Sequence, residues 1–242
     1  MSDTFIDKTR SVNRVTRFFA AGACAGLLAA CTTTQQAAVV QSDIKCGFLG
    51  PACAQLTPGQ EGQLALRYVD PAAKWSQYTK IMIQPVTFWG DANSKVSPED
   101  QQRLVNFLYT ALDQELAKQF QVVDQDGPDV MKLQVAVTDL AAATPGLRTI
   151  TMVLPQARLL STVKKGATGS YPFVGGAQAE FKLTDSVTGG ILVAGVDRRI
   201  GGGNISTAAQ WERGDAENVM KEWAKLAAER LSAWTKGAAK PA

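Results

Sequence analysis

Apolar residues from Leu104 onward recur at four-residue spacing, which predicts an amphipathic helix. Ser97 can cap its N-terminus, Pro98 suits the first helical position, and the two acids that follow favour the helix dipole. A stripe with this spacing buries one face of a helix against a core. The stripe consists of Leu104, Leu108, Leu112, Leu116 and Phe120.

A second helical pattern begins at about Asp215 and continues close to the C-terminus. Its apolar side consists of Val219, Met220, Trp223, Leu226, Ala227, Leu231 and Trp234. We therefore expect two long amphipathic helices, each with one face that packs against other elements. The tryptophans of the chain are expected to serve this packing and the core rather than a ligand cage.

Two-residue alternation of apolar and polar positions indicates strands over 131–138 and 177–184. Such strands are typical of a sheet that buries one face and exposes the other to solvent. A turn cluster at 185–190, followed by further apolar residues, predicts a hairpin over 177–199.

Ile81-Met82-Ile83 indicates one more buried strand, and Pro85 predicts an edge or a bulge just after it. Strands combined with two amphipathic helices predict an α+β fold. We expect a two-layer sandwich in which both helices pack on one face of a mainly antiparallel or mixed sheet.

Residues 1–30 have the organisation of an export signal. Four basic residues precede an uncharged run over 18–30, which is shorter than the roughly 20 residues of a membrane span. Leu28-Ala29-Ala30-Cys31 resembles the lipobox of bacterial lipoproteins, in which the cysteine becomes the first mature residue and carries acyl chains. The resemblance implies lipid attachment at Cys31, whereas the alternative is ordinary cleavage beside a small residue. Thr32, in place of an aspartate, favours the outer membrane by analogy with lipoprotein sorting.

Composition and charge exclude several classes of function. The 242 residues are 45% hydrophobic and 19% charged, which is ordinary for a globular protein. The formal net charge of +3 is too small for a protein that grips nucleic-acid phosphates, so no nucleic-acid partner is expected. The sequence contains no histidine, which removes His-dependent catalytic triads and His-ligated metals. We expect no metal and no other cofactor.

Cys46 and Cys53 remain once a signal is removed and Cys31 is lipidated. The turn dipeptide Gly50-Pro51 between them could bring the two α-carbons within bonding distance. Because exported cysteines meet an oxidising compartment, we predict a structural disulfide that stabilises the fold by about 2.5 kcal/mol. Two free thiols or a redox pair are the alternatives, although the spacing differs from the C-x-x-C of redox sites.

The chain divides into four parts on these grounds. Residues 1–30 are a lipoprotein signal peptide, and 31–55 form a lipidated N-terminus and tether with a small disulfide loop. Residues 56–236 form a single α+β domain, which leaves 237–242 as a disordered tail.

Several local motifs could carry chemistry, and each has a simpler interpretation. Ser161-Thr-Val-Lys164 matches the Ser-x-x-Lys of penicillin-binding enzymes, but their other motifs are missing and a surface helix turn explains it. Gly201-Gly-Gly203 could form an anion-binding nest or a flexible connection from a strand to a helix. Three aspartates near strand ends could do acid–base work or form turns. They are Asp139, Asp185 and Asp197.

Tyr171 and Phe173 lie in a glycine-rich connection over 169–176. Aromatic side chains on a long loop are candidates for contact with a partner. The alternative is that they fold back as a lid over the core, because burial of aromatic rings is strongly favourable.

Several stretches resemble a family of uncharacterised bacterial lipoproteins, the domain of unknown function three-three-one-three. They are Cys46-Gly-Phe-Leu, Ala65-Leu-Arg-Tyr-Val69, Pro85-Val-Thr-Phe-Trp-Gly90, Ser97-Pro-Glu-Asp-Gln-Gln102, Ala177-Gln-Ala-Glu180, Leu183-Thr-Asp185 and Val196-Asp-Arg-Arg199. The resemblance covers most of 45–235. It implies only an envelope lipoprotein, because the family has no agreed activity or catalytic residues to carry over to this sequence.

Three functions remain open. We expect a lipid-anchored protein of the bacterial outer membrane, facing the periplasm, that binds an envelope protein partner as a non-catalytic adaptor. A passive structural lipoprotein is one alternative. The other is a small-ligand-binding or hydrolytic domain that uses Asp197, Arg198 and Arg199. If the protein is an adaptor, as we expect, it is not an enzyme.

Overall fold

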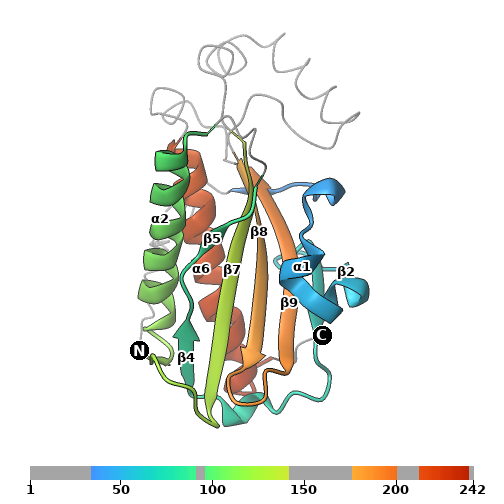
Figure 1. Cartoon of the computed structure of the whole chain (residues 1–242). Helices are drawn as coiled ribbons and strands as arrows, with labels where there is room; N and C mark the ends of the chain where they lie inside the picture. The colour runs from blue at the N-terminus through green and yellow to red at the C-terminus, as the bar shows by residue number, and fades with distance from the viewer. Residues whose placement is uncertain (1–33, 91–95, 142–175, 201–212, 240–242) are drawn as a thin grey trace, which may run out of the picture. The chain divides into compact units, whose positions relative to one another are not determined.

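The computed structural model describes residues 34–90, 96–141, 176–200 and 213–239 (Figure 1). The strands in these ranges are β1 (Gln35–Gln36), β2 (Thr57–Pro58), β3 (Leu66–Val69), β4 (Lys80–Ile83), β5 (Thr87–Phe88), β6 (Gln121–Val122), β7 (Val130–Ala141), β8 (Gly176–Asp185) and β9 (Ile191–Ile200). The α-helices are α1 (Cys46–Leu49), α2 (Pro98–Leu116) and α6 (Arg213–Thr235), with 3-10 turns η1 (Gln41–Asp43), η2 (Gly50–Gln55) and η3 (Trp75–Gln77).

The strands form one mixed sheet in the order β2-β3-β9-β8-β7-β4-β6, with β1 beside β9 and β5 beside β7. The long strands β7, β8 and β9 pair antiparallel at its centre, so the predicted hairpin over 177–199 is confirmed. The predicted α+β class and mixed sheet are confirmed as well.

β4 and β5 pair in succession with β7, both in the parallel direction. Pro85 lies in the gap between them and cannot donate a backbone hydrogen bond to a ladder, which agrees with the expected interruption. Parallel strands need a long crossover connection, and α2 supplies one between β5 and β7.

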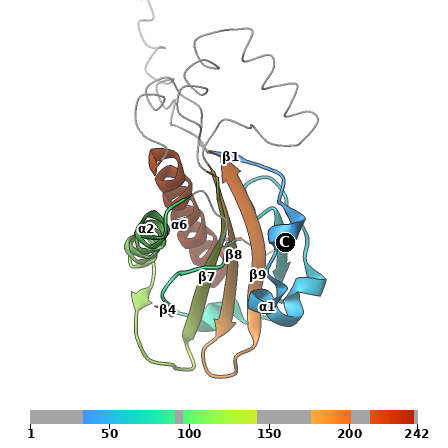
Figure 2. The same ribbon diagram turned by 45° about the horizontal axis from the view of Figure 1, so that its top comes forward.

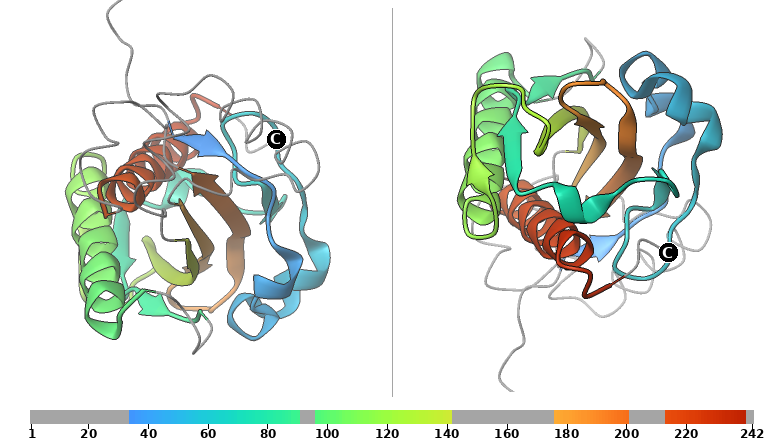
Figure 3. Two further views of the ribbon diagram at one scale, coloured as in Figure 1. Left: turned by 90° about the horizontal axis from the view of Figure 1, so that it is seen from above. Right: turned by 90° about the horizontal axis from the view of Figure 1, so that it is seen from below.

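Helices α2 and α6 pack against each other on one face of the sheet (Figures 2 and 3). The hydroxyl oxygen of Ser97 accepts a hydrogen bond from the backbone N–H of Asp100 at 3.1 Å, which caps α2 as expected. The apolar stripes of both helices meet the apolar positions of β7 and β8 in the main core cluster. We call this side of the sheet the helix face.

The opposite side of the sheet is covered by residues 34–58, as Figure 1 shows for the segment that contains α1. Phe48 and Leu49 pack there on Ala194 and Val196 of β9, and Gln35 and Gln36 pair with the end of the same strand. We call this side the N-terminal face. The expected tether over 31–55 is therefore wrong for its described part, because residues 34–55 belong to the folded domain.

Polar side chains of β8 hold this segment in place. The Nζ of Lys182 donates to the carbonyl of Phe48 at 2.7 Å, and the side chain of Gln178 accepts from the backbone N–H of Val40 at 2.9 Å. Glu180 accepts from the backbone N–H of Lys45. Alternation correctly placed Gln178, Glu180 and Lys182 on one side of β8. The expectation that this side faces solvent was wrong, because residues 40–48 cover it. The expected two-layer sandwich therefore omits a third layer, which residues 34–58 form on the N-terminal face.

Candidate functional site

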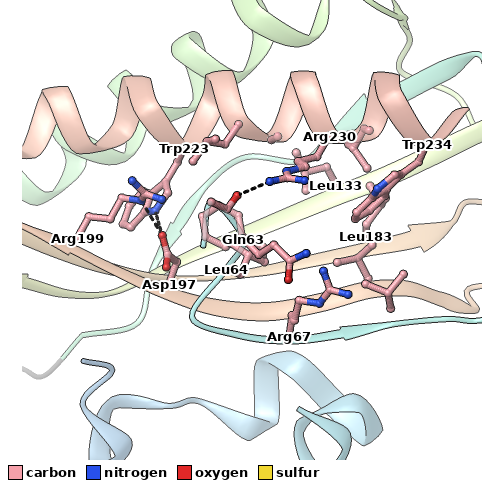
Figure 4. Close-up of a pocket in the computed structure, with 17 residues that line it drawn as sticks. Gln63, Leu64, Arg67, Leu133, Leu183, Asp197, Arg199, Trp223, Arg230 and Trp234 are labelled. Atoms are coloured by element: carbon pink, nitrogen blue, oxygen red, sulfur yellow. Dashed lines mark hydrogen bonds and ion pairs between the residues drawn. The ribbon is translucent and has the colours of Figure 1, made fainter. Parts of the chain in front are cut away.

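A pocket of about 100 Å³ lies between α6 and the sheet on its β3–β9 side (Figure 4). Its walls are largely apolar because α6 turns its apolar stripe toward the sheet here, while β3 extends the sheet beyond the helix. Half-buried apolar residues lining it are Leu64, Val69, Val193, Leu226, Ala227 and Trp234. We call it the α6–β3 pocket.

Two glycines shape the pocket wall. A Cβ at Gly195 would lie 2.5 Å from the Cδ1 of Leu64, so only glycine lets this leucine rest on β9. Gly62 has a φ of 74°, a left-handed conformation that favours glycine. Its carbonyl accepts a hydrogen bond from the guanidinium of Arg230 at 3.0 Å, which joins the loop before β3 to α6.

One end of the pocket is closed by Asp197, whose side chain is 1% exposed. One carboxylate oxygen accepts from the Nε of Arg199 and the indole N–H of Trp223, both at 2.8 Å. The other accepts from the side chain of Gln36 at 2.5 Å and the backbone N–H of Ala65 at 3.1 Å. Four donors, one of them the paired Arg199, satisfy the hydrogen-bonding capacity of this buried carboxylate. Asp197 therefore joins four segments of the chain as a structural residue.

The structure separates the three residues considered for Asp/Arg chemistry. Successive residues of a strand point to opposite faces, so Asp197 and Arg199 lie on the helix face and Arg198 on the other. Arg198 forms an ion pair with Asp139 at 3.2 Å instead. These residues are part of the scaffold and do not converge on one site.

Asp185, the third aspartate considered, forms a turn. Its carboxylate accepts from the backbone N–H groups of Val187 and Thr188 and from the hydroxyl of Tyr78, the last at 2.9 Å. Burial opposes ionisation of Asp185, but these hydrogen bonds hold its pKa below the usual value. Burial, together with the bond to Asp185, raises the pKa of Tyr78 to about 12. The pair is a structural hydrogen bond, and the turn interpretation is confirmed for Asp185.

The mouth of the α6–β3 pocket carries two positive charges. Arg67 comes from β3 and Arg230 from α6, and both line the pocket. In Figure 4 the guanidinium group of Arg230 is directed toward a backbone carbonyl, that of Gly62. Burial and then the charge of Arg230 lower the pKa of the Arg67 guanidinium.

Other predicted positions lie elsewhere. Cys46 and Cys53 are joined by a disulfide with their α-carbons 5.4 Å apart, on the N-terminal face and away from the pocket. The remaining predicted positions lie outside the described residues. They are Cys31, Tyr171, Phe173, Ser161, Lys164 and Gly201 to Gly203.

Two features are absent from the part of the chain that the structure describes, a metal-binding cluster and a membrane-spanning helix. There, no three Cys, Asp or Glu side chains come together in a group that could hold a metal ion. Nor does any helix within these ranges combine the length and the apolar character that a bilayer crossing requires.

Sequence reasoning missed both arginines of the pocket, although a signal existed for one. Arg230 falls four residues after Leu226 and four before Trp234, within the apolar stripe predicted for the second helix. A charge inside an apolar stripe marks a place where the stripe is incompletely buried. Arg67 carried no such signal, because its role depends on α6 lying opposite β3.

Comparison with known proteins gives one family. The family model described as Protein of unknown function (DUF3313) matches residues 45–227. The protein named Uncharacterized lipoprotein YdcL, from Escherichia coli strain K12, is 26% identical over 138 residues, which is 56% of this chain and 61% of the relative. The chain thus spans about three fifths of the length of the curated relatives it matches.

Solved structures show only distant likeness. PelC from Paraburkholderia phytofirmans, described as a dodecamer, has a TM-score of 0.38 at 11% identity and covers 66% of this chain and 94% of its own. A Xanthomonas campestris protein of family DUF330 has a TM-score of 0.36 at 9% identity, covering 71% and 94%. Both TM-scores lie below 0.5, so these likenesses support no conclusion about this chain.

Proposed function

This chain belongs to the family described as Protein of unknown function (DUF3313), and on that premise we propose that it is an envelope lipoprotein that binds a partner protein without catalysis. Lipid attachment at Cys31 would hold it in the outer membrane, facing the periplasm. A relative that is named a lipoprotein supports the anchor, as does the resemblance of residues 28–31 to a lipobox.

The α6–β3 pocket is the observation that carries the binding role. It is apolar, it opens beside two arginines, and Trp234 forms part of its wall. Tryptophan and arginine dominate the energetics of protein–protein contacts because they bury large areas and still form directed polar bonds. A purely structural domain would be more stable if side chains filled this pocket, so an open pocket supports a binding role.

A catalytic role receives no comparable support from the described residues. The acidic side chain that lines the pocket is Asp197, and both of its oxygens already accept hydrogen bonds. A general base needs a free lone pair within reach of a substrate proton. Partner binding therefore explains the pocket better than hydrolysis does.

Site-specific crosslinking in living cells tests the binding role. A photo-crosslinking amino acid is placed at Leu226 in the pocket wall and, as a control, at Tyr109, which is exposed on α2. We expect one saturable crosslinked partner from position 226, none from position 109, and loss of the product in Arg230→Gln. The same abundant envelope proteins at both positions would instead indicate a passive structural lipoprotein.

The predicted contact through Tyr171 and Phe173 is tested in the same strain. Tyr171→Ala combined with Phe173→Ala should leave the crosslink from position 226 unchanged if the pocket alone binds the partner. Loss of the product would assign the contact to Tyr171 and Phe173. Cys31→Ser, assayed by incorporation of labelled palmitate, tests the anchor separately and should abolish labelling.

A further inference from the structure

We propose that one end of the sheet, where β1 begins and β9 ends, lies against the lipid surface to which Cys31 is anchored. The turn between β8 and β9 then lies farthest from the membrane. We call the membrane end the anchor rim, and it consists of Thr34, Gln35 and Ile200. The inference rests on the lipid anchor of the proposed function and specifies how the domain is held on that membrane.

The chain is fixed to the sheet almost directly after the anchor position. The guanidinium of Arg199 donates to the hydroxyl oxygen of Thr34 at 3.4 Å, and Gln35 pairs with Ile200 in the next position along the chain. Among the described residues, contacts with the sheet therefore start three residues after Cys31.

So short a connection cannot hold the domain away from a membrane. Whatever its path, a chain advances at most about 3.6 Å per residue, so Thr34 lies within about 11 Å of Cys31. A tether over 31–55, as expected from the sequence, would have allowed about 85 Å. The anchor rim is therefore confined to the neighbourhood of the lipid surface.

The direction of β1 determines which end of the sheet meets the membrane. β1 is antiparallel to β9, and Gln35 is level with Ile200, the last residue of β9. The chain therefore enters the sheet at the end where β9 leaves it, as Figure 2 shows. β7 ends and β8 begins at the same level, because Ala141 pairs with Gly176 and Gly176 pairs with Ile200.

The turn between β8 and β9 lies at the opposite end of the sheet. β9 rises about 3.3 Å per residue, so its first residue, Ile191, lies about 30 Å from Ile200. The α6–β3 pocket lies between these levels, because its lining extends from Arg199 near the rim to Leu183 near the turn. A partner that enters this pocket must therefore come within about 40 Å of the membrane.

The covalent anchor, rather than charge, determines the contact with lipid. Arg199 and Arg198 are each paired with an aspartate, at 2.8 and 3.2 Å, and Gln35 is exposed and uncharged. On the helix face, α2 begins at the same end of the sheet with Glu99 and Asp100 (Figure 1), whose charges would be repelled by an anionic surface. The orientation should therefore form on a zwitterionic bilayer, with the β1 side nearest to it.

Fluorescence quenching from the lipid surface tests the inference. The full-length lipidated protein is placed in phosphatidylcholine nanodiscs that contain a lipid with a nitroxide on its headgroup. A fluorescent amino acid replaces one of three exposed residues, Gln35 in the rim, Tyr109 on α2 or Val187 in the far turn. Quenching should be strongest at 35, weaker at 109, and at least about tenfold weaker at 187 than at 35, because about 30 Å separates the two ends.

A lengthened anchor provides the matched comparison. Insertion of about 12 Gly and Ser residues between Thr33 and Thr34 adds a flexible span of about 20 Å and should lower the quenching at position 35 at least about threefold. The same insertion after Gly237, which follows α6, should leave all three values unchanged. Quenching that persists after the first insertion would overturn the inference, because the short anchor would then not be what orients the domain.

The remaining outcomes separate this inference from the proposed function. Equal quenching at positions 35 and 187 would show that the sheet lies along the bilayer, which overturns the inference, as does an unquenched position 35 in a protein that incorporates palmitate. If palmitate does not label the protein, the anchor and this inference both fail. If the three positions are quenched as expected but no partner is crosslinked at position 226, the orientation holds and the adaptor function fails.

Discussion

The two faces of the central sheet are covered by different means. On the helix face, α2 and α6 bury a large apolar cluster against β7 and β8. On the N-terminal face, a smaller apolar cluster is supplemented by polar side chains of β8 that bind the backbone of residues 40–48.

The two faces differ in how precisely the segment that covers them must be positioned. Apolar burial is non-directional, so a helix can settle on a sheet wherever its stripe meets apolar residues. Hydrogen bonds from Gln178 and Lys182 need a backbone group at one position, and each becomes costly if its partner leaves. The helix face therefore carries most of the stability, whereas the N-terminal face fixes the path of one segment.

Matched leucine truncations on the two faces test this most strongly. Leu108 and Leu49 are both 0% exposed, the first on the helix face and the second on the N-terminal face. Leu108→Ala should lower the free energy of unfolding by about 4 kcal/mol and Leu49→Ala by about 2 kcal/mol, because the thinner cover can collapse into the cavity. Urea unfolding measures both. Equal losses would show that the N-terminal cover is as rigid as the helices.

Loss of the disulfide should have the next largest effect. Cys46→Ser with Cys53→Ser removes the cross-link that closes α1 and η2 into a loop on the N-terminal face. The free energy of unfolding should fall by about 2.5 kcal/mol, since the unfolded chain regains the entropy of an open loop. Dithiothreitol should reproduce the loss in the parent protein and have no effect on the variant. An unchanged stability would mean that the hydrogen bonds of β8 suffice to hold the segment.

Glu180 is expected to make the N-terminal face sensitive to pH. Its side chain is 0% exposed, and burial raises the pKa of its carboxyl group despite the hydrogen bond from Lys45. A raised folded-state pKa contributes stability that is present below the unfolded-state pKa and is lost as the pH rises through the folded-state value.

Glu180→Gln removes this penalty and should raise the free energy of unfolding by roughly 1 kcal/mol at neutral pH. The gain should shrink toward zero as the pH falls below the ordinary pKa of a glutamate. Glu229→Gln, on the exposed side of α6, should show no such trend. A gain that is independent of pH would show that Glu180 is not the titrating group.

Arg230→Gln should have the smallest effect on stability. It removes one hydrogen bond to Gly62 but also relieves the repulsion with Arg67, so the net change should stay within about 0.5 kcal/mol. Thermal unfolding of the variant checks this. A loss of several kcal/mol would make Arg230 a structural residue of the helix face rather than a residue kept for binding.

The helix face was largely predictable from the sequence, and the N-terminal face was not. The stripe beginning at Leu104 and the cap at Ser97 are local signals, so they identified α2 directly. Alternation over 177–184 located β8, but a polar position has the same spacing whether it meets water or a distant backbone. Glu180 and its partner Lys45 are 135 residues apart, and no local pattern encodes such a contact. The α6–β3 pocket escaped prediction for the same reason, since Arg67 and Arg230 are brought together only by the fold.

Residues 34–58 are far in sequence from the strands that bind them, and this separation affects the order in which the contacts form during folding. Synthesis completes residues 34–58 first, yet Gln178 and Asp197, which receive Val40 and Gln36, lie 138 and 161 residues later. The segment must therefore remain without its final contacts until β8 and β9 exist. Contacts between residues so far apart in sequence slow folding. The disulfide between Cys46 and Cys53 spans only seven residues and can form early. Its early closure would present the waiting segment as a preformed loop to the last strands of the sheet.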